Sequence, residues 1–292
     1  MHFAIYGKSA SEASIPYLES LLDKLAESRS GIFIYEPYLQ VIRDKVKLPA
    51  EYQLFYHNQD IRDRVDVLLS IGGDGTLLDT ITLVRNSGIP ILGINLGKLG
   101  FLTSISREDL SDGIDQILSG EYNIDERTLL RLEDGQKLFG ELAYALNELT
   151  VYKKGSLSMI TVHTYVNDRF LNSYWGDGLI VSTPTGSTAY SLSCGGPIII
   201  PEAENFVITP IATHNLTVRP VIIPDNSLIR IRVEGRQKHF NLSLDSRSLC
   251  VEAPFEFSIR KENFKIKLLK LKDWDFFRTI RSKLNWGMDI RN

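Results

Sequence analysis

The sequence predicts a doubly wound α/β domain followed by a β-sandwich-like domain. Over residues 1–120, short apolar runs alternate with segments of helical periodicity, a pattern typical of a parallel sheet with helices on both faces. From 121 to 271 the apolar runs are short, β-rich and separated by turn residues. Residues 272–292 return to a helical pattern, and we expect this segment to pack back on the first domain. A chain of 292 residues has room for two domains.

Apolar periodicity and glycine define the elements of the first domain. Four leucines recur at i, i+3, i+4 and i+7 between residues 12 and 29, which predicts a helix there. The run 65–71 is mostly apolar, as expected of a parallel strand buried on both faces. The other predicted elements are strands at 2–6, 31–35 and 89–95 and helices at 76–85 and 107–118.

The second domain is predicted from short runs between turn signals. Its expected strands are 127–132, 142–152, 159–166, 179–183, 206–211, 228–234, 239–244, 255–260 and 264–271. Residues 166–169 and 223–226 have the chemistry of turns. Charged and apolar residues alternate from Arg260 to Lys272, so we expect those charges on the solvated face of a strand. Residues 273–286 have helical periodicity.

Composition excludes several classes of protein. Lys and Arg number 33 against 36 Asp and Glu, so the basic excess of a nucleic-acid-binding protein is missing. No apolar run is long enough to span a membrane, and the amino terminus does not have the pattern of a signal peptide. The two cysteines, Cys194 and Cys250, are too few for a disulfide framework, and the histidines show no metal-ligand spacing. These features favour a cytoplasmic protein.

The segment Gly72-Gly73-Asp74-Gly75-Thr76 lies between the buried strand 65–71 and a predicted helix. Glycines let a phosphate approach the backbone closely, and a helix start offers free N–H groups to an anion. The carboxylate of Asp74 repels phosphate, so it is better suited to accept a proton from a hydroxyl or to hold Mg²⁺. The alternative is a tight turn whose aspartate caps the helix. No Walker A loop is present, because the run from Gly93 to Lys98 is one residue too short, and no dinucleotide-binding glycine fingerprint opens a helix.

Polar residues also interrupt the second domain. Asn147 and Glu148 interrupt an apolar run, and an amide beside a carboxylate suits a base edge or a ribose diol; a plain strand end is the alternative. Asp177 precedes the strand 179–183 and is placed to accept from a ribose hydroxyl. The run from Thr183 to Ser193 offers hydroxyl donors, N–H groups at a predicted helix start and one stacking ring; the alternative is a helix N-cap after a turn.

Together these motifs resemble the ATP-NAD kinase family, and the bacterial members closely. The most specific part of the resemblance is the run Thr183–Ser193, because diacylglycerol kinases, sphingosine kinases and phosphofructokinases look similar around the Gly-Gly-Asp-Gly segment. The resemblance implies transfer of the γ-phosphate of ATP to the 2′-hydroxyl of the adenosine ribose of NAD, giving NADP. It also implies a divalent metal, with Mg²⁺ expected, and a homodimer or homotetramer.

The resemblance also implies roles for individual residues. Asp74 would be the general base, the loop glycines would cradle phosphates, and the ring of Tyr190 would pack on a ring of the substrate. The residues expected to bind substrate or nucleotide are Gly72, Gly73, Gly75, Thr76, Asn147, Glu148, Asp177, Thr188, Ala189, Tyr190, Ser191, Leu192, Ser193 and Arg247. No residue is assigned to the metal.

Three positions depart from the family pattern. Trp175 and Asp79 stand where the family often carries a basic residue, or at 79 a small one, which leaves the neutralisation of phosphate charge open. Arg247 stands where many relatives have Gln, and its charge could compensate or favour a 2′-phosphate. Two alternatives to an NAD kinase are a lipid kinase that shares the Gly-Gly-Asp-Gly loop and a non-catalytic regulator that binds NADP(H).

Overall fold

A computed structural model describes residues 1–97, 100–155, 158–236 and 238–287. Lys98 of the excluded Walker-like run, and residues 288–292 of the predicted carboxy-terminal segment, lie outside the described residues. The chain divides into two compact units. One comprises Met1–Glu126 together with Ile266–Asn292, and the other comprises Arg127–Lys265.

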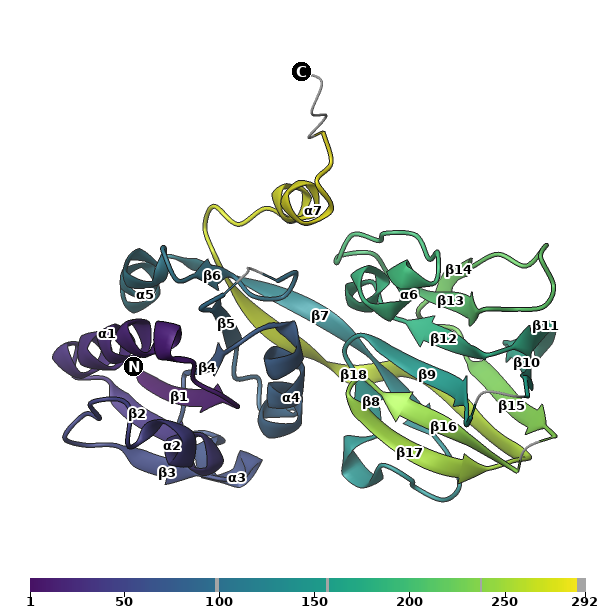
Figure 1. The fold of residues 1–292 in the computed structure, drawn as a ribbon, viewed down its shortest axis with the longest axis horizontal. Coiled ribbons are helices and arrows are strands. Elements are labelled where there is room, and N and C mark those ends of the chain that lie inside the picture. The colour runs from purple at the N-terminus through teal and green to yellow at the C-terminus, as the bar shows by residue number, and fades with distance from the viewer. Residues whose placement is uncertain (98–99, 156–157, 237, 288–292) are drawn as a thin grey trace. The chain divides into compact units, whose positions relative to one another are not determined.

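The first unit is built on a parallel sheet (Figure 1). Its strands are β1 (His2–Gly7), β2 (Gly31–Tyr35), β3 (Gln53–Phe55), β4 (Val67–Ile71) and β5 (Ile91–Asn95), with the short β6 (Ile105–Ser106) beside β5. They lie in the order β3-β2-β1-β4-β5, and the last part of β18 (Phe255–Leu271) pairs with β5 through Leu268 and Ile91. The direction of this order reverses between β1 and β4, and such switch points are where open α/β sheets bind ligands.

Helices connect these strands and bury apolar faces. They are the 3-10 turn η1 (Glu12–Ser14), α1 (Ile15–Glu27), α2 (Glu36–Ile42), α3 (Asn58–Ile61), α4 (Asp74–Val84), α5 (Leu110–Leu118) and α7 (Phe276–Leu284). The four periodic leucines of α1 are all buried, as their spacing predicts. Helices α1 and α5 lie side by side (Figure 1), where the ammonium of Lys24 on α1 pairs with Asp115 on α5 at 2.6 Å. Elements α2, β3 and α3 are short and were not predicted.

The second unit is a β-sandwich-like arrangement of two antiparallel sheets. In one sheet, β11 (Arg169–Gly176), β10 (Ile160–Val166), β15 (Ile229–Gly235) and β18 follow one another, and β7 (Tyr122–Glu133) pairs with β18 and with β8 (Tyr144–Ala145). In the other sheet the order is β14 (Val221–Pro224), β13 (Asn205–Ile211), β12 (Gly178–Ser182), β9 (Glu148–Lys153), β16 (His239–Leu244) and β17 (Arg247–Glu252). Buried apolar side chains from both sheets form one core. The connections include η2 (Gly140–Leu142), η3 (Thr185–Thr188) and α6 (Tyr190–Ser193).

The predicted fold class is confirmed, with local differences. Strands β11, β14 and β17 were not predicted, because two of them follow or overlap the predicted turns and β17 is largely exposed. The expected single strand 142–152 is two strands, since β8 and β9 pair in different sheets. The expected strands 255–260 and 264–271 are one continuous strand, β18. The chain passes from one unit to the other at 126/127 and 265/266, whereas the sequence pattern changes at 120 and 271.

The side chain of Lys270 corrects another expectation. The alternation of charge along β18 placed it on a solvated face, but it is 2% exposed and its ammonium donates to the carbonyl of Leu102 at 2.8 Å. Within the part of the chain that the structure describes, no helix is long and apolar enough to cross a membrane.

Candidate functional site

The Gly72–Thr76 loop lies at the carboxyl end of β4, at the switch point of the first unit's sheet. Gly72 has a φ of 151°, and a Cβ there would overlap the side chain of Thr76, so this position requires glycine. Around Gly75, outside its own stretch of helix, no heavy atom of the described residues lies within 4 Å of where a Cβ would be, so this side of the backbone is open to an incoming group. Helix α4 begins at Asp74, two residues earlier than predicted.

The carboxylate of Asp74 has a specific set of partners. It accepts hydrogen bonds from the backbone N–H groups of Phe101 at 2.7 Å, Leu102 at 3.1 Å and Thr103 at 3.2 Å. The N-cap of α4 is Gly73, and the hydrogen bonds given above for the Asp74 carboxylate go to another loop, so the alternative of an aspartate that caps the helix does not describe it. A Cβ at Gly100 would overlap this carboxylate. The loop 100–103 is therefore shaped to hold Asp74, a role that only the tertiary structure reveals.

The loop 100–103 is itself held from the end of β18. Lys270 donates to the carbonyl of Leu102, and the hydroxyl of Ser104 donates to the carbonyl of Leu269 at 3.1 Å. Within the loop, the N–H of Gly100 donates to the hydroxyl of Thr103 at 2.7 Å. The carboxy-terminal part of the chain thus fixes the surroundings of Asp74, although no sequence motif near Lys270 indicated this.

One departure from the family pattern lies close to this loop and has a partner of its own. Asp79, on α4, forms an ion pair with Lys8. Burial, with the nearby charges of Asp79 and Tyr35, raises the pKa of Tyr6 well above its usual range. Lys8 therefore places a positive charge beside the position where the family often has a basic residue.

In the second unit, Asn147 and Glu148 lie where the chain passes from β8 to β9. The carbonyl of Asn147 accepts from the N–H of Thr183 at 2.9 Å, which joins this segment to the start of the Thr183–Ser193 run. A Cβ at Gly186 would overlap the Asn147 carbonyl, so glycine is needed for this close approach. Glu148 is also the first residue of β9, so the strand end expected by the alternative is present, at a point where the chain crosses between the two sheets.

Glu148 has an unusual electrostatic environment. Burial and the neighbouring charge of Asp245 raise the pKa of Glu148 to about 8. Its Oε2 atom is buried, and no hydrogen-bond partner is found for it within the described part of the chain. Near neutral pH the carboxyl is therefore largely protonated and can donate as well as accept a hydrogen bond.

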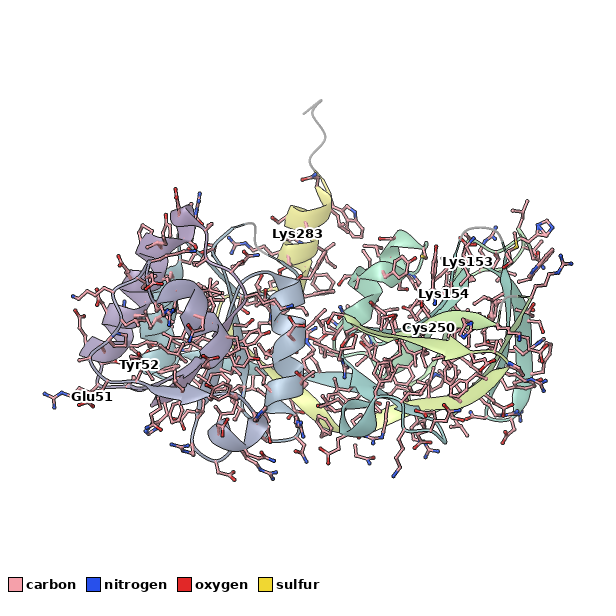
Figure 2. All side chains as sticks on the ribbon, turned by 60° about the horizontal axis from the view of Figure 1, so that its bottom comes forward. Glu51, Tyr52, Lys153, Lys154, Cys250 and Lys283 are labelled. Atoms are coloured by element: carbon pink, nitrogen blue, oxygen red, sulfur yellow. The ribbon has the colours of Figure 1, made fainter. Side chains whose placement is uncertain are left out.

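Asp177 and Tyr190 lie in the same neighbourhood. The carboxylate of Asp177 forms an ion pair with Lys153, labelled in Figure 2, at 2.7 Å. Partial burial, with Cys194, Tyr152 and Asp177 nearby, raises the pKa of Tyr190. The ring of Tyr190 is 39% exposed, which leaves a face free for stacking.

The hydroxyls of the Thr183–Ser193 run mostly point inward. Thr183 donates to the Leu146 carbonyl at 2.5 Å, and the hydroxyls of Ser191 and Thr209 lie 2.8 Å apart. Ser187 accepts from the N–H of Ile199 at 2.9 Å. These hydroxyls hold the loop together rather than offering themselves to a ligand. The expected helix start is only a 3-10 turn followed by the single turn α6, so the helix-dipole argument does not apply here.

The remaining predicted residues differ in exposure. Ser193 is exposed, whereas Thr188, Ala189 and Leu192 are half-buried. Trp175, which departs from the family pattern, is 51% exposed, and its ring meets His214 edge-on at 4.7 Å between centroids.

Arg247 has its guanidinium directed to the backbone. It donates to the carbonyls of Leu142 and Tyr144, and it lies 5.9 Å from the centre of the Tyr144 ring. Its charge therefore helps to hold the segment before β8, a role that the resemblance did not imply.

The two cysteines are free thiols. Cys250 is exposed and accepts a hydrogen bond from the ammonium of Lys154 at 3.2 Å (Figure 2). Burial is the main cause that raises the pKa of Cys194, and the charge of Glu148 adds to it.

The acidic, histidine and cysteine side chains of the described residues are not grouped as metal ligands would be. Among the described residues, no three His, Cys, Asp or Glu side chains lie close enough together to hold an ion. Asp74, the carboxylate of the glycine loop, already accepts three N–H donors. The described side chains therefore do not form a Mg²⁺ site built from protein ligands alone.

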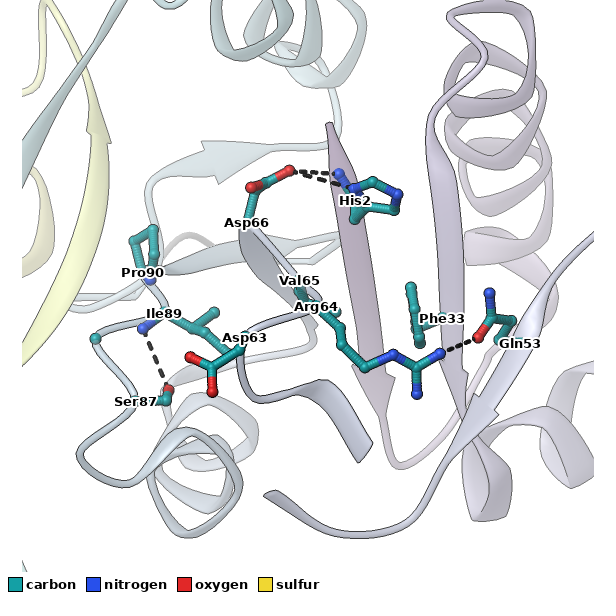
Figure 3. Close-up of a pocket in the computed structure, with 11 residues that line it drawn as sticks. His2, Phe33, Gln53, Asp63, Arg64, Val65, Asp66, Ser87, Ile89 and Pro90 are labelled. Atoms are coloured by element: carbon teal, nitrogen blue, oxygen red, sulfur yellow. Dashed lines mark hydrogen bonds and ion pairs between the residues drawn. The ribbon is translucent and has the colours of Figure 1, made fainter. Parts of the chain in front are cut away.

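A cavity of about 650 Å³ lies elsewhere in the first unit (Figure 3). Its wall includes His2 at the start of β1, Asp66 just before β4, and Arg64, whose guanidinium carbon lies 5.0 Å from the centre of the Phe33 ring. This is the amino end of the strands, opposite to the end that carries the Gly72–Thr76 loop. It is therefore separate from the candidate site.

Comparison with known proteins identifies the family of this chain. The family model of the ATP-NAD kinase N-terminal domain matches residues 39–122, and that of the C-terminal domain matches residues 146–271. The chain belongs to the ATP-NAD kinase family. As a member of the ATP-NAD kinases it is an enzyme, a kinase that acts on an alcohol group, and its function is that of an NAD kinase.

Relatives match over the full length of this ATP-NAD kinase. It is 48% identical to the NAD kinase of Cytophaga hutchinsonii and 44% identical to that of Flavobacterium psychrophilum, and each comparison covers 100% of both chains. Two solved structures share its fold at 24% identity. Yeast NADH kinase complexed with NADH has a TM-score of 0.87, covering 100% of this chain and 89% of that one. An NAD kinase from Archaeoglobus fulgidus in complex with ATP has a TM-score of 0.72, covering 98% and 99%.

Proposed function

We propose that this chain transfers the γ-phosphate of ATP to the 2′-hydroxyl of the adenosine ribose of NAD. In the step, the ribose oxygen bonds to the γ-phosphorus, the bond from that phosphorus to the β–γ bridging oxygen breaks, and ADP leaves. NADP is the product. The glycine loop proposed for the phosphates belongs to the first unit, and the residues proposed for NAD belong to the second. The observation that carries the proposal is the Asp74 carboxylate, held in place beside an open glycine backbone at a switch point.

Asp74 is proposed as the general base. A carboxylate has roughly four lone-pair positions, and three N–H donors leave one for the proton of the ribose hydroxyl. The three amides fix the direction in which this position points. General-base catalysis of this kind contributes typically ~10²–10⁴ in rate, and positioning by Gly72, Gly73 and Gly75 adds to it.

The proposed NAD site is centred on Asn147 and Glu148. A protonated Glu148 can both donate a hydrogen bond to a ribose diol and accept one from it. Such bonds would provide the buried Oε2 atom with the partner that it lacks among the described residues. Tyr190 offers a ring face for stacking, and Asp177 with Lys153 forms a charged pair close to it. Thr76 and the rest of the run 188–193 complete the proposed set of binding residues. Within this set Ser191 contributes through its backbone, and Arg247 supports the site through the carbonyls that it binds.

Several further properties belong to this proposal. A divalent metal, with Mg²⁺ expected, would accompany the phosphates of ATP and neutralise their charge, and no residue of this chain is assigned to it. Two free thiols suit a reducing compartment, so we place the enzyme in the cytoplasm. The family resemblance is the basis for proposing a homodimer or homotetramer.

The test is NADP formation from NAD, ATP and Mg²⁺ by the purified protein, with Asp74→Asn beside it. The parent should form NADP, and the variant should be slower by ~10² or more. Asp112→Asn, at an exposed position of α5, is the matched control and should keep the parent rate. No NADP from a parent that still binds NAD in calorimetry would favour the non-catalytic regulator instead.

The same variant needs a second measurement. An Asn side chain has one acceptor oxygen and an NH₂ group, so it cannot accept all three N–H bonds as Asp74 does. Amide hydrogen exchange at residues 101–103 therefore separates two causes of lost activity. Unchanged exchange would assign the loss to the missing base, and faster exchange would assign part of it to a released loop.

A further inference from the structure

The turn between β16 and β17 carries an aspartate whose bonds all go to one segment. The carboxylate of Asp245 accepts from the N–H groups of Leu146 at 2.9 Å, Asn147 at 2.8 Å and Glu148 at 3.2 Å. Its own N–H donates to the carbonyl of Glu148 at 3.0 Å. The φ of Asp245 is 51°, a left-handed conformation that Asp and Asn tolerate better than most residues.

This segment needs such a partner because its first two residues belong to neither sheet. Residues 146 and 147 lie between β8 and β9, which pair in different sheets, so no strand ladder satisfies their backbone groups. Thr183 donates to the carbonyls of this segment, from its hydroxyl to Leu146 and from its N–H to Asn147. Asp245 accepts the hydrogen bonds from the N–H groups. The two residues together fix the backbone that presents the Asn147 and Glu148 side chains.

We propose that Asp245 is a positioning residue for NAD: the three N–H bonds that it accepts fix the Leu146–Glu148 backbone and thereby the Asn147 and Glu148 side chains. The proposal rests on the proposed function, in which Asn147 and Glu148 bind NAD. Asp245 itself touches neither substrate nor the transferred phosphate. Neither the sequence patterns nor the family resemblance pointed to this role.

The charges around Glu148 give the proposal a specific signature. Asp245 faces Glu148 from the β16–β17 turn, Cys194 faces it from the end of α6, and Arg247 faces Asp245 from β17. Burial raises the pKa of Asp245, while its three N–H partners and Arg247 favour the charged form. The charge of Asp245 in turn raises the pKa of Glu148, so neutralising residue 245 should lower the pKa of Glu148.

The test compares Asp245→Asn with Asp134→Asn in the full-length protein. Asn is isosteric and tolerates the backbone conformation at 245. Asp134 is the matched control, because its carboxylate also accepts two backbone N–H bonds, from Gln136 and Leu138, in another turn of the same unit. We expect Asp245→Asn to raise KM for NAD by roughly 10-fold while KM for ATP changes little. Asp134→Asn should leave both values unchanged.

The pH dependence of kcat/KM distinguishes a residue that positions Glu148 and affects its pKa from a residue that only supports the fold. For Asp245→Asn, the inflection that Glu148 gives to kcat/KM for NAD should move to lower pH by about half a unit or more. A residue that only supports the fold would lower activity at every pH without moving the inflection. An unmoved profile, or equal increases in the KM values for NAD and ATP, would overturn the proposal.

Hydrogen exchange of the parent protein provides a measurement that does not depend on a variant folding. The amides of Leu146, Asn147 and Glu148 should exchange slowly because Asp245 accepts from all three. Fast exchange at these amides in the parent would overturn the proposal. If the parent forms no NADP but its amides at 146–148 still exchange slowly, the proposed function is contradicted. The hydrogen bonds from these amides to Asp245 would then still be supported.

Discussion

At the scale of single residues, two aspartates in different units make the same kind of hydrogen-bonding arrangement with a nearby loop. Asp74 accepts three successive N–H groups from residues 101–103, and Asp245 accepts three from residues 146–148. Such bonds hold a carboxylate and a loop in one mutual arrangement, and they are stronger than bonds between neutral groups. The proposed base and the proposed NAD-binding segment are each fixed by backbone groups that sequence motifs do not display.

Gly100 provides a direct check on the Asp74 arrangement. In Gly100→Ala the new Cβ would overlap the Asp74 carboxylate, so either the loop or the carboxylate must move. We expect kcat to fall by ~10² or more, because small misplacements of a catalytic group have effects of this size. Gly97→Ala is the control, since its Cβ would lie 3.4 Å from the nearest atom, in Asn95. The rate of NADP formation at steady state is measured for both variants. Equal rates for Gly100→Ala and Gly97→Ala would show that the overlap with the Asp74 carboxylate does not affect catalysis.

Glu148 should make stability depend on pH. Its pKa is about 8 in the folded protein and near 4.5 in the unfolded chain, so the folded state holds the proton more tightly. Its stabilising effect is therefore complete below about pH 4.5 and is lost as the pH rises towards 8. Between pH 6 and 8.5 the parent should lose roughly 1–3 kcal/mol of unfolding free energy relative to Glu148→Gln. Urea unfolding at both pH values measures this difference, and parallel pH dependences would contradict it.

At the scale of elements, strand β18 connects the core of the first unit with the candidate site. Its residue Leu269 belongs to the buried core around β1, β4 and β5, and the next residue, Lys270, donates to the loop that holds Asp74. The end of one strand thus packs the core and supports the site through adjacent residues. The alternation of side chains along a strand makes this possible, because successive residues face opposite sides.

Lys270→Met should show how much this contact contributes. Met keeps the length and apolar stem of the side chain but removes the ammonium that donates to Leu102 and lies 4.3 Å from the centre of the Trp274 ring. We expect a loss of about 1–3 kcal/mol in unfolding free energy and a slower NADP-forming rate. Lys272→Met removes an exposed ion pair with Glu121 and should cost under ~1 kcal/mol. Urea denaturation compares the two, and similar losses would mean that burial of Lys270 does not matter.

At the scale of the whole molecule, the chain leaves the first unit near residue 126 and returns near residue 266. The first unit is therefore assembled from both ends of the sequence. Its sheet is completed by the last residues of β18 beside β5. A chain that ends before this return lacks part of that unit's core.

Two truncations separate the contribution of β18 from that of α7. Ending the chain after Lys265 removes Leu268, Leu269 and Lys270, and two buried leucines alone are worth roughly 2–5 kcal/mol each. We expect this chain to lose cooperative thermal unfolding of the first unit. Ending it after Lys272 keeps those residues and removes α7, and this chain should still unfold cooperatively. Circular dichroism during heating distinguishes them, and two identical melting curves would contradict the assignment to β18.

By itself the sequence determined the fold class, most strands and helices, and the family. Apolar periodicity and glycine positions express local preferences, so the α1 leucines and the Gly72–Thr76 loop were found from sequence. Only the tertiary structure decided which polar groups meet, because those contacts join residues distant in the chain. Asp245 lies 98 residues from Asn147, and Lys270 lies 168 from Leu102. It also decided that the hydroxyls of Thr183 and Ser191 face inward and that the strand expected over 142–152 breaks between two sheets. Local pattern cannot reveal these outcomes, since a buried polar group takes whichever partner the packed chain brings to it.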